Sequence, residues 1–428
     1  MIDRRTLLCG FTAAFPASAW ARAEGRLARA AWEAALFSFS IGEMARAAAA
    51  TPARNRLGHR RTLSDHRNRA VTMPNNDTLY SSCWLTLPPG AYADFDIPVN
   101  AERYVSAALM SMDTDVVALE SSPGQSSSNG RIRIVGPGWQ GGLPRDRRLV
   151  RSPSEDAWVL IRTSVDGPGG LAAAQAVQAQ IGLTVTGAPE APRASAAPLA
   201  DPADQLRSQV NSLLARTDPD APLASRSRQH RRFGIGNLFE PRPEDDAAWR
   251  KAVASLNAAE IGDITDHGRL VSGWHWPNRN IAQYGNDERF RAAVALSGFG
   301  ALPEREAIYL TAMRDASGLP LAPGKTYRID FGNPPPVNAF WSLSAYRGEP
   351  DGRFFFVSNP IERYSVGSKT PGMEQGGTII AAPSAPADRR AVWLPIVDGP
   401  FRLVLRCYLP DALLLNRTWI PPAITPIS

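Results

Sequence analysis

The alternation of apolar and polar residues predicts that β-strands form much of this chain. After the segment Pro74-Asn75-Asn76-Asp77-Thr78, the alternate residues Leu79, Cys83 and Leu85 share one face of a predicted strand. Segments with the same two-residue period follow, and turn sequences such as Pro88-Pro89-Gly90 separate them. The pattern predicts N-terminal strands at 79–87, 91–97, 103–112, 116–119, 131–135 and 158–163, a set typical of a β-sandwich.

Helical spacing of apolar residues appears at the start and in the middle of the chain. Residues 22–50 are rich in alanine and carry Trp32, Leu36 and Phe39 at helical spacing. A Pro/Ala-rich stretch at 187–203 is typical of a linker or loop. The spacing predicts further helices at 168–181, 203–216, 244–259 and 286–297.

Strand patterns return in the last third of the chain. In the segment 401–409 the residues Leu403, Leu405 and Cys407 share one face, and the opposite face carries Arg406. Because these patterns resume after the helical region, they predict a second sandwich or a jelly roll. The C-terminal strands are predicted at 308–313, 327–331, 337–346, 354–357, 378–381 and 401–409.

The fold class is therefore predicted to be mainly β with a helical insertion. The length of 428 residues favours more than one domain. The predicted division is a signal peptide (1–21), an N-terminal helix (22–50), an N-terminal β-sandwich (51–166), a helical region with a linker (167–300) and a C-terminal β-sandwich (301–428).

The N-terminus has the pattern of an export signal. The pair Arg4-Arg5 precedes an apolar stretch, 6–19, and a small-x-small site at Ala19-Trp20-Ala21. The paired arginines indicate the twin-arginine route, and an ordinary secretory signal is the alternative. No later stretch is long and apolar enough to span a bilayer, so the sequence predicts a periplasmic or secreted protein without a transmembrane segment.

Charge and cysteine content narrow the function classes. The formal net charge is +6, and the basic runs 145–151 and 226–232 contain no interleaved aromatic residues. A nucleic-acid interface needs a coherent basic face with stacking residues, so we expect no nucleic-acid partner. The cysteines beyond the predicted signal, Cys83 and Cys407, each fall on an apolar strand face, which favours two separate cores over a disulfide.

Strong catalytic motifs are absent from the sequence. It contains no Gly-x-Ser-x-Gly elbow, no His-Glu-x-x-His, no Cys-x-x-Cys, no phosphate-binding loop and no dinucleotide fingerprint. With five histidines at unrelated positions, we expect neither a metal nor a cofactor. His275, between Trp274 and Trp276, is a candidate for acid-base work, and a hydrogen-bonded core histidine is the alternative.

Three polar groups of residues are candidates for ligand binding. Arginines with Tyr hydroxyls and Asn amides can hold a carboxylate or phosphate. The structural alternative is that Asn75 to Asp77 only cap a turn and that Arg402 and Arg406 line a solvated sheet face. The groups are Asn75, Asn76, Asp77 and Tyr80 with Arg103; Asn359, Arg363 and Tyr364; and Arg402, Arg406 and Tyr408.

These same residues resemble two families of unknown function. The segment 74–80 followed by Arg103-Tyr104 resembles the family numbered 1254. The later segments 334–343, 359–365, 393–402 and 419–422 are similar to the family numbered 1214. The resemblance implies an immunoglobulin-like sandwich, a helical insertion and a jelly-roll-like sandwich, and it implies no particular activity.

Our function hypothesis from the sequence is an exported protein that binds a small polar or anionic ligand in a cleft between its β-domains. Its enzymatic version is a metal-independent hydrolase, which requires Asp77, Arg363 and Arg406 to converge on one open pocket. The alternative is a non-catalytic binding or envelope-interaction module. The candidate catalytic residues are Asp77, Tyr80, Tyr364 and His275, and the candidate ligand-binding residues are Asn75, Asn76, Arg103, Trp341, Asn359, Arg363 and Arg406.

Overall fold

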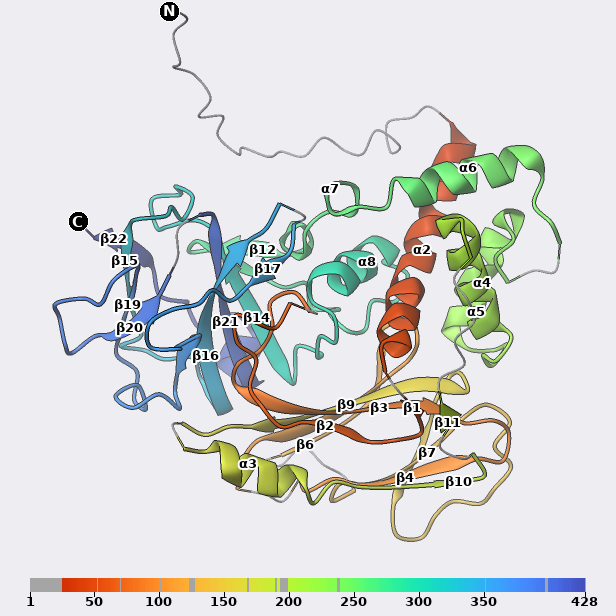
Figure 1. Cartoon of the computed structure of the whole chain (residues 1–428), viewed down its shortest axis with the longest axis horizontal. Coiled ribbons are helices and arrows are strands. Elements are labelled where there is room, and N and C mark those ends of the chain that lie inside the picture. Colours follow the sequence, from red (N-terminus) through yellow and green to blue (C-terminus); the bar gives the residue numbers. More distant parts are fainter. Residues whose placement is uncertain are drawn as a thin grey trace, which may run out of the picture.

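The computed structural model describes residues 25–427 apart from 52, 70, 100–101, 123–127, 168, 189–190, 193–198, 237–238, 351 and 397–398. The predicted signal peptide, 1–21, lies outside the described residues. The described chain is mainly β, as the pattern predicts, with helices between two β parts. Figure 1 shows the N-terminal sheets at the bottom, the C-terminal sheets on the left and helices at the upper right.

The N-terminal β part consists of two sheets that share one hydrophobic core. Cys83, Leu85, Phe95, Ile132 and Val159 are among the side chains that fill it. One sheet has the order β2 (Gly58–Arg60), β3 (Thr78–Thr86), β9 (Asp156–Ser164), β5 (Val105–Met110) and β6 (Val116–Ser122). The other has the order β10 (Gly182–Thr186), β4 (Tyr92–Asp96), β7 (Arg131–Val135) and β8 (Arg148–Arg151). A short pair, β1 (Ala53–Arg54) and β11 (Ala191–Pro192), lies beside them.

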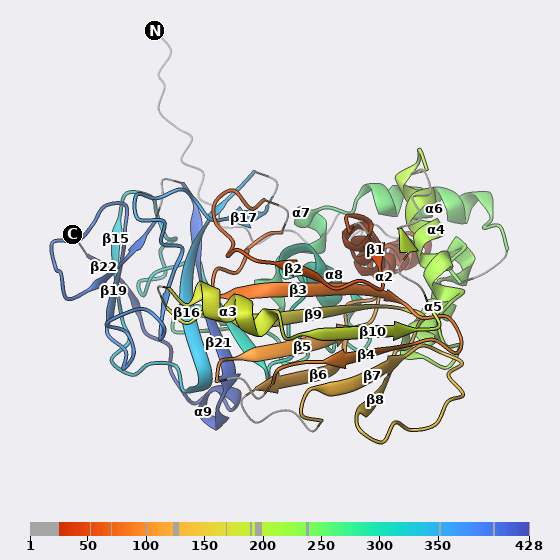
Figure 2. The same ribbon diagram turned by 60° about the horizontal axis from the view of Figure 1, so that its bottom comes forward.

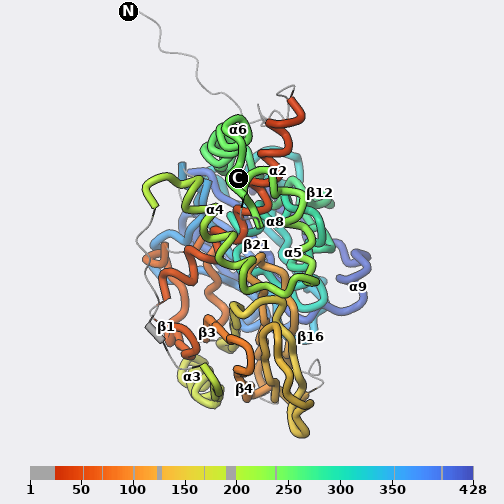
Figure 3. Tube along the Cα trace, turned by 90° about the vertical axis from the view of Figure 1, so that its right-hand side faces the viewer, coloured from red at the N-terminus to blue at the C-terminus, as the bar shows by residue number. Residues whose placement is uncertain are grey.

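Helix α2 and the helices packed on it cover the other face of the five-stranded sheet. Helix α2 (Arg26–Ala49) is alanine-rich, and it packs on this face and on the middle helices through buried residues such as Phe37 and Met44. In Figure 3, α4 and α6 lie at the end of the molecule opposite to α3 and β4. The remaining helices are α3 (Leu171–Gln178), α4 (Pro202–Leu214), α5 (Pro222–Ser227), α6 (Pro243–Ala254), α7 (Ala258–Ile261) and α8 (Glu288–Ser297), with 3₁₀ turns η1 (Arg228–Phe233) and η2 (Ile264–His267).

The C-terminal β part also has two sheets around a shared core, which contains Trp341, Leu405 and Cys407. Its larger sheet has the order β12 (Arg269–Val271), β13 (Trp274–Trp276), β14 (Ala307–Ala312), β21 (Phe401–Pro410), β16 (Val337–Gly348) and β17 (Phe354–Phe355), and β18 (Ser365–Gly367) also pairs with β16. Its smaller sheet has the order β20 (Val392–Pro395), β19 (Thr378–Ala382), β15 (Thr326–Asp330) and β22 (Ile424–Ile427). A short helix, α9 (Ala412–Leu415), follows β21.

Strand β21 has two different faces, and both are buried. Leu403, Leu405 and Cys407 point into the C-terminal core, as the alternation predicts. Arg402 and Arg406, on the opposite face, are 3% and 4% exposed, so the alternative of a solvated sheet face is wrong. That face is covered because the C-terminal sheet stands across the end of β3 and β9 (Figure 2) and contacts the loop before β3.

Cys83 and Cys407 are free, and each lies in its own core, as predicted. The central region gives strands to both β parts, because β10 pairs with β4 and β13 pairs with β14. The β parts thus extend past the predicted limits at 166 and 301. The immunoglobulin-like and jelly-roll orders are finer than these sheet arrangements and stay predictions. No helix within the described ranges is long and apolar enough to cross a membrane.

Candidate functional site

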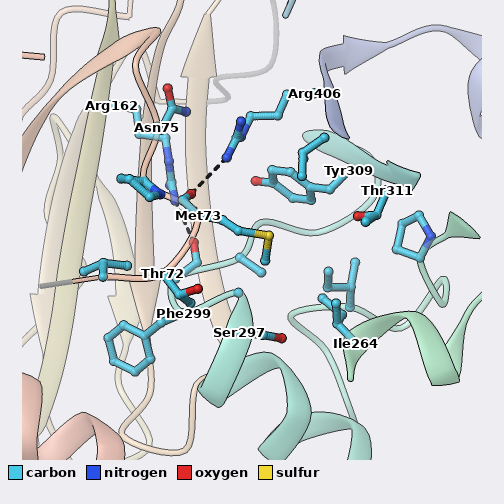
Figure 4. A pocket seen from close by; sticks show the side chains of 18 of the residues that line it. Thr72, Met73, Asn75, Arg162, Ile264, Ser297, Phe299, Tyr309, Thr311 and Arg406 are labelled. Carbon is cyan, nitrogen blue, oxygen red and sulfur yellow. Dashed lines mark hydrogen bonds between the residues drawn. The ribbon is translucent and has the colours of Figure 1, made fainter. Parts of the chain in front are cut away.

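A cavity of about 290 Å³ lies where the two β parts and the helical region meet. Strand β9 and strand β21 form opposite walls, with Arg162 from the first and Arg406 from the second. The loop before β3 contributes Met73 and Asn75, and the turn after α8 contributes Phe299. Figure 4 shows these side chains around the cavity. We call this space the interdomain cavity.

Two buried arginines line the interdomain cavity without a carboxylate partner. Arg162 is 5% exposed and donates from Nη2 to the Gly300 carbonyl oxygen (2.6 Å), whereas its Nη1 has no partner among the described residues. Arg406 donates from Nη2 to the Met73 carbonyl oxygen (3.0 Å), as Figure 4 shows, and from Nη1 to Ser344 Oγ (3.4 Å). Within the described part of the chain, neither arginine forms an ion pair, and no Asp or Glu lines the cavity.

The two guanidinium groups act on the same tyrosine. Burial raises the pKa of Tyr309, and the positive charges of Arg162 and Arg406 both oppose that rise. Both charges therefore lie within electrostatic reach of one hydroxyl group that lines the cavity. Because an arginine keeps its proton in a protein, the cavity wall carries two permanent positive charges. Such a wall favours an anion.

Aromatic rings form the apolar part of the cavity wall. The ring of Trp158 stacks on the ring of Phe299 with 5.3 Å between centroids, and on its other side it stacks on Trp84 at 4.9 Å. Gly300 has a φ of +79°, and a Cβ atom there would lie 3.3 Å from Leu160. The turn can therefore place Phe299 against Trp158 because residue 300 is a glycine. The cavity thus has an apolar side and a cationic side.

Four of the predicted site residues line the interdomain cavity: Asn75, Tyr80, His275 and Arg406. Asn75 donates from Nδ2 to the Tyr408 hydroxyl oxygen (2.6 Å), so it links the loop before β3 to β21. His275 is half-buried on β13. Burial lowers the pKa of His275 below its ordinary value, although the charge of Asp263 opposes this, so its ring is neutral near pH 7.

Asp77 and Asn76 hold the loop and are not among the cavity-lining residues. The two carboxylate oxygens of Asp77 accept hydrogen bonds from Ser342 (2.5 Å) and Ser365 (2.8 Å) of the C-terminal β part. Asn76 donates from Nδ2 to the carbonyl oxygen of Ser64. The charge of Asp77 reaches Arg406 through space, without a contact between the two side chains. Asp77 therefore joins the two β parts.

Asn359, Arg363 and Tyr364 lie at a second, much smaller cavity of about 10 Å³. The backbone N–H of Arg363 donates to Asn359 Oδ1 (2.9 Å), and its guanidinium donates to the Trp393 carbonyl oxygen (2.8 Å). Burial lowers the pKa of Arg363. The hydroxyl of Tyr364 lies 2.7 Å from His66 Nδ1. These contacts fix a turn, and the cavity is too small for an organic ligand.

Arg103 and Trp341 make structural contacts elsewhere. Arg103 donates to the Ser164 carbonyl oxygen (2.9 Å) and lies 3.6 Å from Asp166. Trp341 is buried in the C-terminal core, where its ring stacks on Phe331 with 4.5 Å between centroids. Neither residue lines the interdomain cavity.

The hydrolase hypothesis required Asp77, Arg363 and Arg406 to converge on one pocket. Instead, Arg406 lines the interdomain cavity, Arg363 lines the second cavity, and Asp77 is among the lining residues of neither. The motif residues separate because the turn at 359–364 lies near Tyr346 at the second cavity, whereas Asp77 accepts hydrogen bonds from serines of β16 and β18. This geometric basis for hydrolysis is therefore missing.

Sequence reasoning missed Arg162, Tyr309 and Phe299 as cavity residues. Arg162 had a readable signal, since it is the charged residue in the interior of the strand Asp156–Ser164, which is buried throughout. Tyr309 and Phe299 have no comparable signal, because aromatic residues in strands and turns are usually packing residues. The described residues also contain no cluster of three or more His, Cys, Asp or Glu side chains placed to hold a metal ion.

One solved structure shares the fold of this chain. The structure is similar to the crystal structure of the VPA0106 protein from Vibrio parahaemolyticus, with a TM-score of 0.70 and 19% identity over 94% of this chain and 100% of that chain. An uncharacterized protein from Burkholderia cenocepacia aligns with a TM-score of 0.43 and 15% identity over 96% of this chain and 91% of that chain. A search of curated protein sequences finds no match.

Two family models match the sequence at separate places. Residues 54–185 match "Protein of unknown function (DUF1254)" and residues 306–412 match "Protein of unknown function (DUF1214)". The first match ends within β10 and the second ends just after β21, so each contains one of the opposing walls of the interdomain cavity. The chain therefore matches the DUF1254 family model in its N-terminal half and the DUF1214 family model in its C-terminal half, as the resemblance predicts.

Proposed function

We propose that this protein binds a small organic anion in the interdomain cavity. One observation carries the proposal: the buried guanidinium groups of Arg162 and Arg406 line the cavity, and within the described residues no carboxylate pairs with either. A buried charge without a partner costs free energy, and proteins keep such charges where a ligand or ion compensates them. A bound anion compensates both arginines at once.

The lining and the volume of the cavity also indicate the size and the apolar part of the ligand. Besides the arginines, Trp158, Phe299 and Ile264 give the lining an apolar surface. The volume of about 290 Å³ is near the lower end of the range for ligand pockets. The ligand that fits is a small molecule with an oxyanion at one end and an apolar body, aromatic or aliphatic, at the other. Such a ligand contacts Arg162 in the first matched segment and Arg406 in the second.

Binding to the wild type is tested by thermal unfolding and calorimetric titration in Tris chloride, a buffer free of organic anions. The probes are phenylacetate, hexanoate and inorganic phosphate, with phenylacetamide as the neutral counterpart of phenylacetate. We expect the two carboxylates to raise the melting temperature and phenylacetamide to leave it unchanged. A ligand at 100 times its Kd adds about 2.7 kcal/mol to the free energy of unfolding, which is a measurable shift.

The site is tested with Arg162→Met and Arg406→Met, which keep much of the side-chain volume and remove the charge. Arg131→Met is the matched control, because Arg131 is half-exposed on the outer sheet and pairs with Asp96 and Asp146. We expect the first two variants to lose the response to phenylacetate and the control to keep it. Equal binding by wild type and Arg162→Met, or no binding of any anion by the wild type, contradicts the proposal.

Hydrolysis is a second candidate, because His275 lines the cavity and burial lowers its pKa. A neutral imidazole accepts a proton from water, and the Tyr80 hydroxyl, which lines the same cavity, is a proton donor. An activity screen with ester, phosphoester and lactone substrates tests this, with wild type beside His275→Gln. Turnover that the substitution abolishes supports hydrolysis. Turnover that survives the substitution removes His275 from the mechanism.

We also propose that the protein is exported, which rests on the pattern of residues 1–21. The pair Arg4-Arg5 followed by the apolar stretch 6–19 supports the twin-arginine route. The test is fractionation of cells that express wild type or the double variant Arg4→Lys, Arg5→Lys. We expect wild type in the periplasm and the double variant in the cytoplasm. An exported double variant indicates an ordinary secretory signal instead.

A further inference from the structure

The amide of Asn75 has only one possible orientation. Its Oδ1 atom lies 2.6 Å from the backbone nitrogen of Asp77, and its Nδ2 atom lies 2.6 Å from the Tyr408 hydroxyl oxygen. A backbone N–H can only donate, so the atom that faces it must be the amide oxygen. The nitrogen of Asn75 therefore donates to Tyr408, and the reverse arrangement is excluded. Asn75 is 7% exposed, so bulk solvent hardly reaches this bond.

The direction of this bond determines what Tyr408 can do. Since the hydroxyl oxygen of Tyr408 accepts from Asn75, its own proton points to some other atom. Among the described residues we find no acceptor for that proton. The ring cannot turn away to find one, because it stacks on Phe340 with 4.3 Å between centroids and packs against Tyr104 at 5.3 Å. Tyr408 thus presents a fixed, unused donor.

The unused donor lies at the cationic side of the interdomain cavity. Tyr408 lines that cavity, two residues along β21 from Arg406 and on the same strand face. Burial raises the pKa of Tyr408 well above its ordinary value, so the hydroxyl is protonated near pH 7. A protonated hydroxyl beside two guanidinium groups adds a third donor for oxygen atoms, and it adds no charge.

We infer that Tyr408 donates a hydrogen bond to the oxyanion of the bound ligand and that Asn75 is a positioning residue, which holds the Tyr408 proton toward the cavity. This inference rests on the proposed function and specifies the ligand's charged group as one with acceptor oxygens, a carboxylate or a phosphoryl group. It also gives the loop 74–80 a role in binding that does not require Asp77 to touch the ligand. Asp77 contributes its backbone N–H, which fixes the Asn75 amide.

The test is a double-mutant cycle on the affinity for phenylacetate, measured by calorimetry with Tyr408→Phe, Asn75→Ala and the double variant. Tyr408→Phe keeps the ring and removes the donor, so we expect its Kd to rise about tenfold or more, the usual loss for a hydrogen bond to a charged group. Asn75→Ala frees the hydroxyl to rotate, so we expect a smaller rise. In the Tyr408→Phe background, Asn75→Ala should have no further effect on Kd, because its contribution acts through that hydroxyl.

The control is Tyr104→Phe, which removes another buried hydroxyl from a ring that touches Tyr408. The Tyr104 hydroxyl donates to Glu306 (2.6 Å), and Tyr104 is not among the residues that line the interdomain cavity. We expect Tyr104→Phe to lower stability and to leave the Kd for phenylacetate unchanged. A Kd for Tyr408→Phe equal to that of wild type overturns the inference, and so does an Asn75→Ala effect that persists in the Tyr408→Phe background.

The failure of this inference is distinguishable from the failure of the proposed function. If wild type binds phenylacetate, Arg162→Met abolishes binding and Tyr408→Phe binds normally, the anion site stands and only the role of Tyr408 is refuted. If wild type binds none of the anions, both proposals are refuted. If Tyr408→Phe proves too unstable to titrate, Asn75→Ala and the control Tyr104→Phe decide. A higher Kd for phenylacetate with Asn75→Ala, together with an unchanged Kd with Tyr104→Phe, supports the inference, and an unchanged Kd with Asn75→Ala overturns it.

Discussion

Two sets of buried arginines in this protein differ in what surrounds them. Arg226 and Arg291, on the helices α5 and α8, lie among the carboxylates of Asp113, Asp115 and Glu288. Arg226 Nε lies 2.6 Å from Glu288, and Arg291 Nη1 lies 3.0 Å from Asp115. Arg162 and Arg406 are buried to a similar degree, yet their hydrogen-bond acceptors are backbone carbonyl oxygens and a serine hydroxyl.

The difference separates a structural role from a binding role. In the first set, burial alone raises the pKa of Asp113, but the charges of Arg291 and Arg226 outweigh burial and lower that pKa. The opposite charges therefore stabilise each other inside the protein, and together they tie the helices to the N-terminal β part. In the second set the charges have no such partner within the described residues, and they lie beside a cavity. An uncompensated charge at a cavity indicates a ligand.

The largest predicted effect is the loss of one partner from the compensated set. Asp113→Asn keeps the size of the side chain and leaves Arg226 and Arg291 with one carboxylate fewer. We expect the free energy of unfolding to fall by about 3–5 kcal/mol, because removal of one partner leaves a buried charge unpaired. Urea unfolding measures it. The matched control is Asp146→Asn, since Asp146 pairs with Arg131 (2.7 Å) at a half-exposed site, where we expect about 1 kcal/mol or less. If both variants lose the same free energy of unfolding, the predicted difference between buried and exposed ion pairs is wrong.

A second prediction concerns pH and His230, which lies beside the compensated set. Burial, with a smaller contribution from the charge of Arg226, lowers the pKa of His230 to about 4 from an ordinary value of 6.5. The unfolded chain therefore binds a proton between these values that the folded protein does not bind. The stabilisation is complete above pH 6.5 and is lost as the pH falls from 6.5 toward 4, by roughly 3 kcal/mol.

The variant His230→Gln, which does not titrate, tests this contribution. We expect its free energy of unfolding to depend less on pH than that of wild type between pH 6.5 and 4. Urea unfolding at intervals of half a pH unit measures both curves. Parallel curves for wild type and variant in that window contradict the prediction. His275→Gln serves as a comparison for a half-buried histidine, and its effect should be smaller.

The variant Asp77→Asn tests whether the Asp77 carboxylate compensates the charge of Arg406. Its charge acts on Arg406 through space, but both carboxylate oxygens already accept from Ser342 and Ser365. Asp77→Asn should therefore lower the free energy of unfolding by about 1–2 kcal/mol, through weaker bonds to the serines. The Kd for phenylacetate should stay within about twofold of wild type, since the Asp77 backbone N–H still holds Asn75. A large loss of anion binding would place Asp77 in the site after all.

The smallest effect on stability is expected from the uncompensated arginines themselves. Arg162→Met removes a buried charge that has no carboxylate partner among the described residues. It also removes the hydrogen bond from Arg162 to the Gly300 carbonyl oxygen. We expect the free energy of unfolding, measured without ligand, to stay within about 1 kcal/mol of wild type or to rise. A loss as large as that of Asp113→Asn would mean that Arg162 stabilises the fold and would remove the contrast between the two sets.

The sequence predicted the strands that carry the site better than the site itself. The two-residue period of β21 separates Leu403 and Leu405 from Arg402 and Arg406, and the structure has the same two faces. What covers the second face depends on how the sheets pack, and no period in the sequence encodes that packing. Arg406 and Arg162 are 244 positions apart in the sequence, and only the crossing of β21 and β9 brings them to one cavity.

The site prediction assumed in two places that polar residues close together in the sequence share one ligand site, and in both places the structure differs. Asn359, Arg363 and Tyr364 form one polar group in the sequence, yet their contacts close a turn around a cavity of about 10 Å³. In the segment 74–80, neighbouring residues have different roles: Asn75 and Tyr80 line the interdomain cavity, and Asp77 holds the two β parts together. A turn reverses side-chain directions from one residue to the next, so adjacent polar residues need not share a site.

The most direct test of the anion site is a crystal structure with 4-bromophenylacetate, whose bromine gives an anomalous signal that marks the ligand body. We predict one bromine per chain in the interdomain cavity, on the side of Trp158 and Phe299, and carboxylate oxygens within hydrogen-bond distance of Arg162, Arg406 and Tyr408. A bromine position outside the cavity, or a carboxylate that contacts neither arginine, contradicts the account.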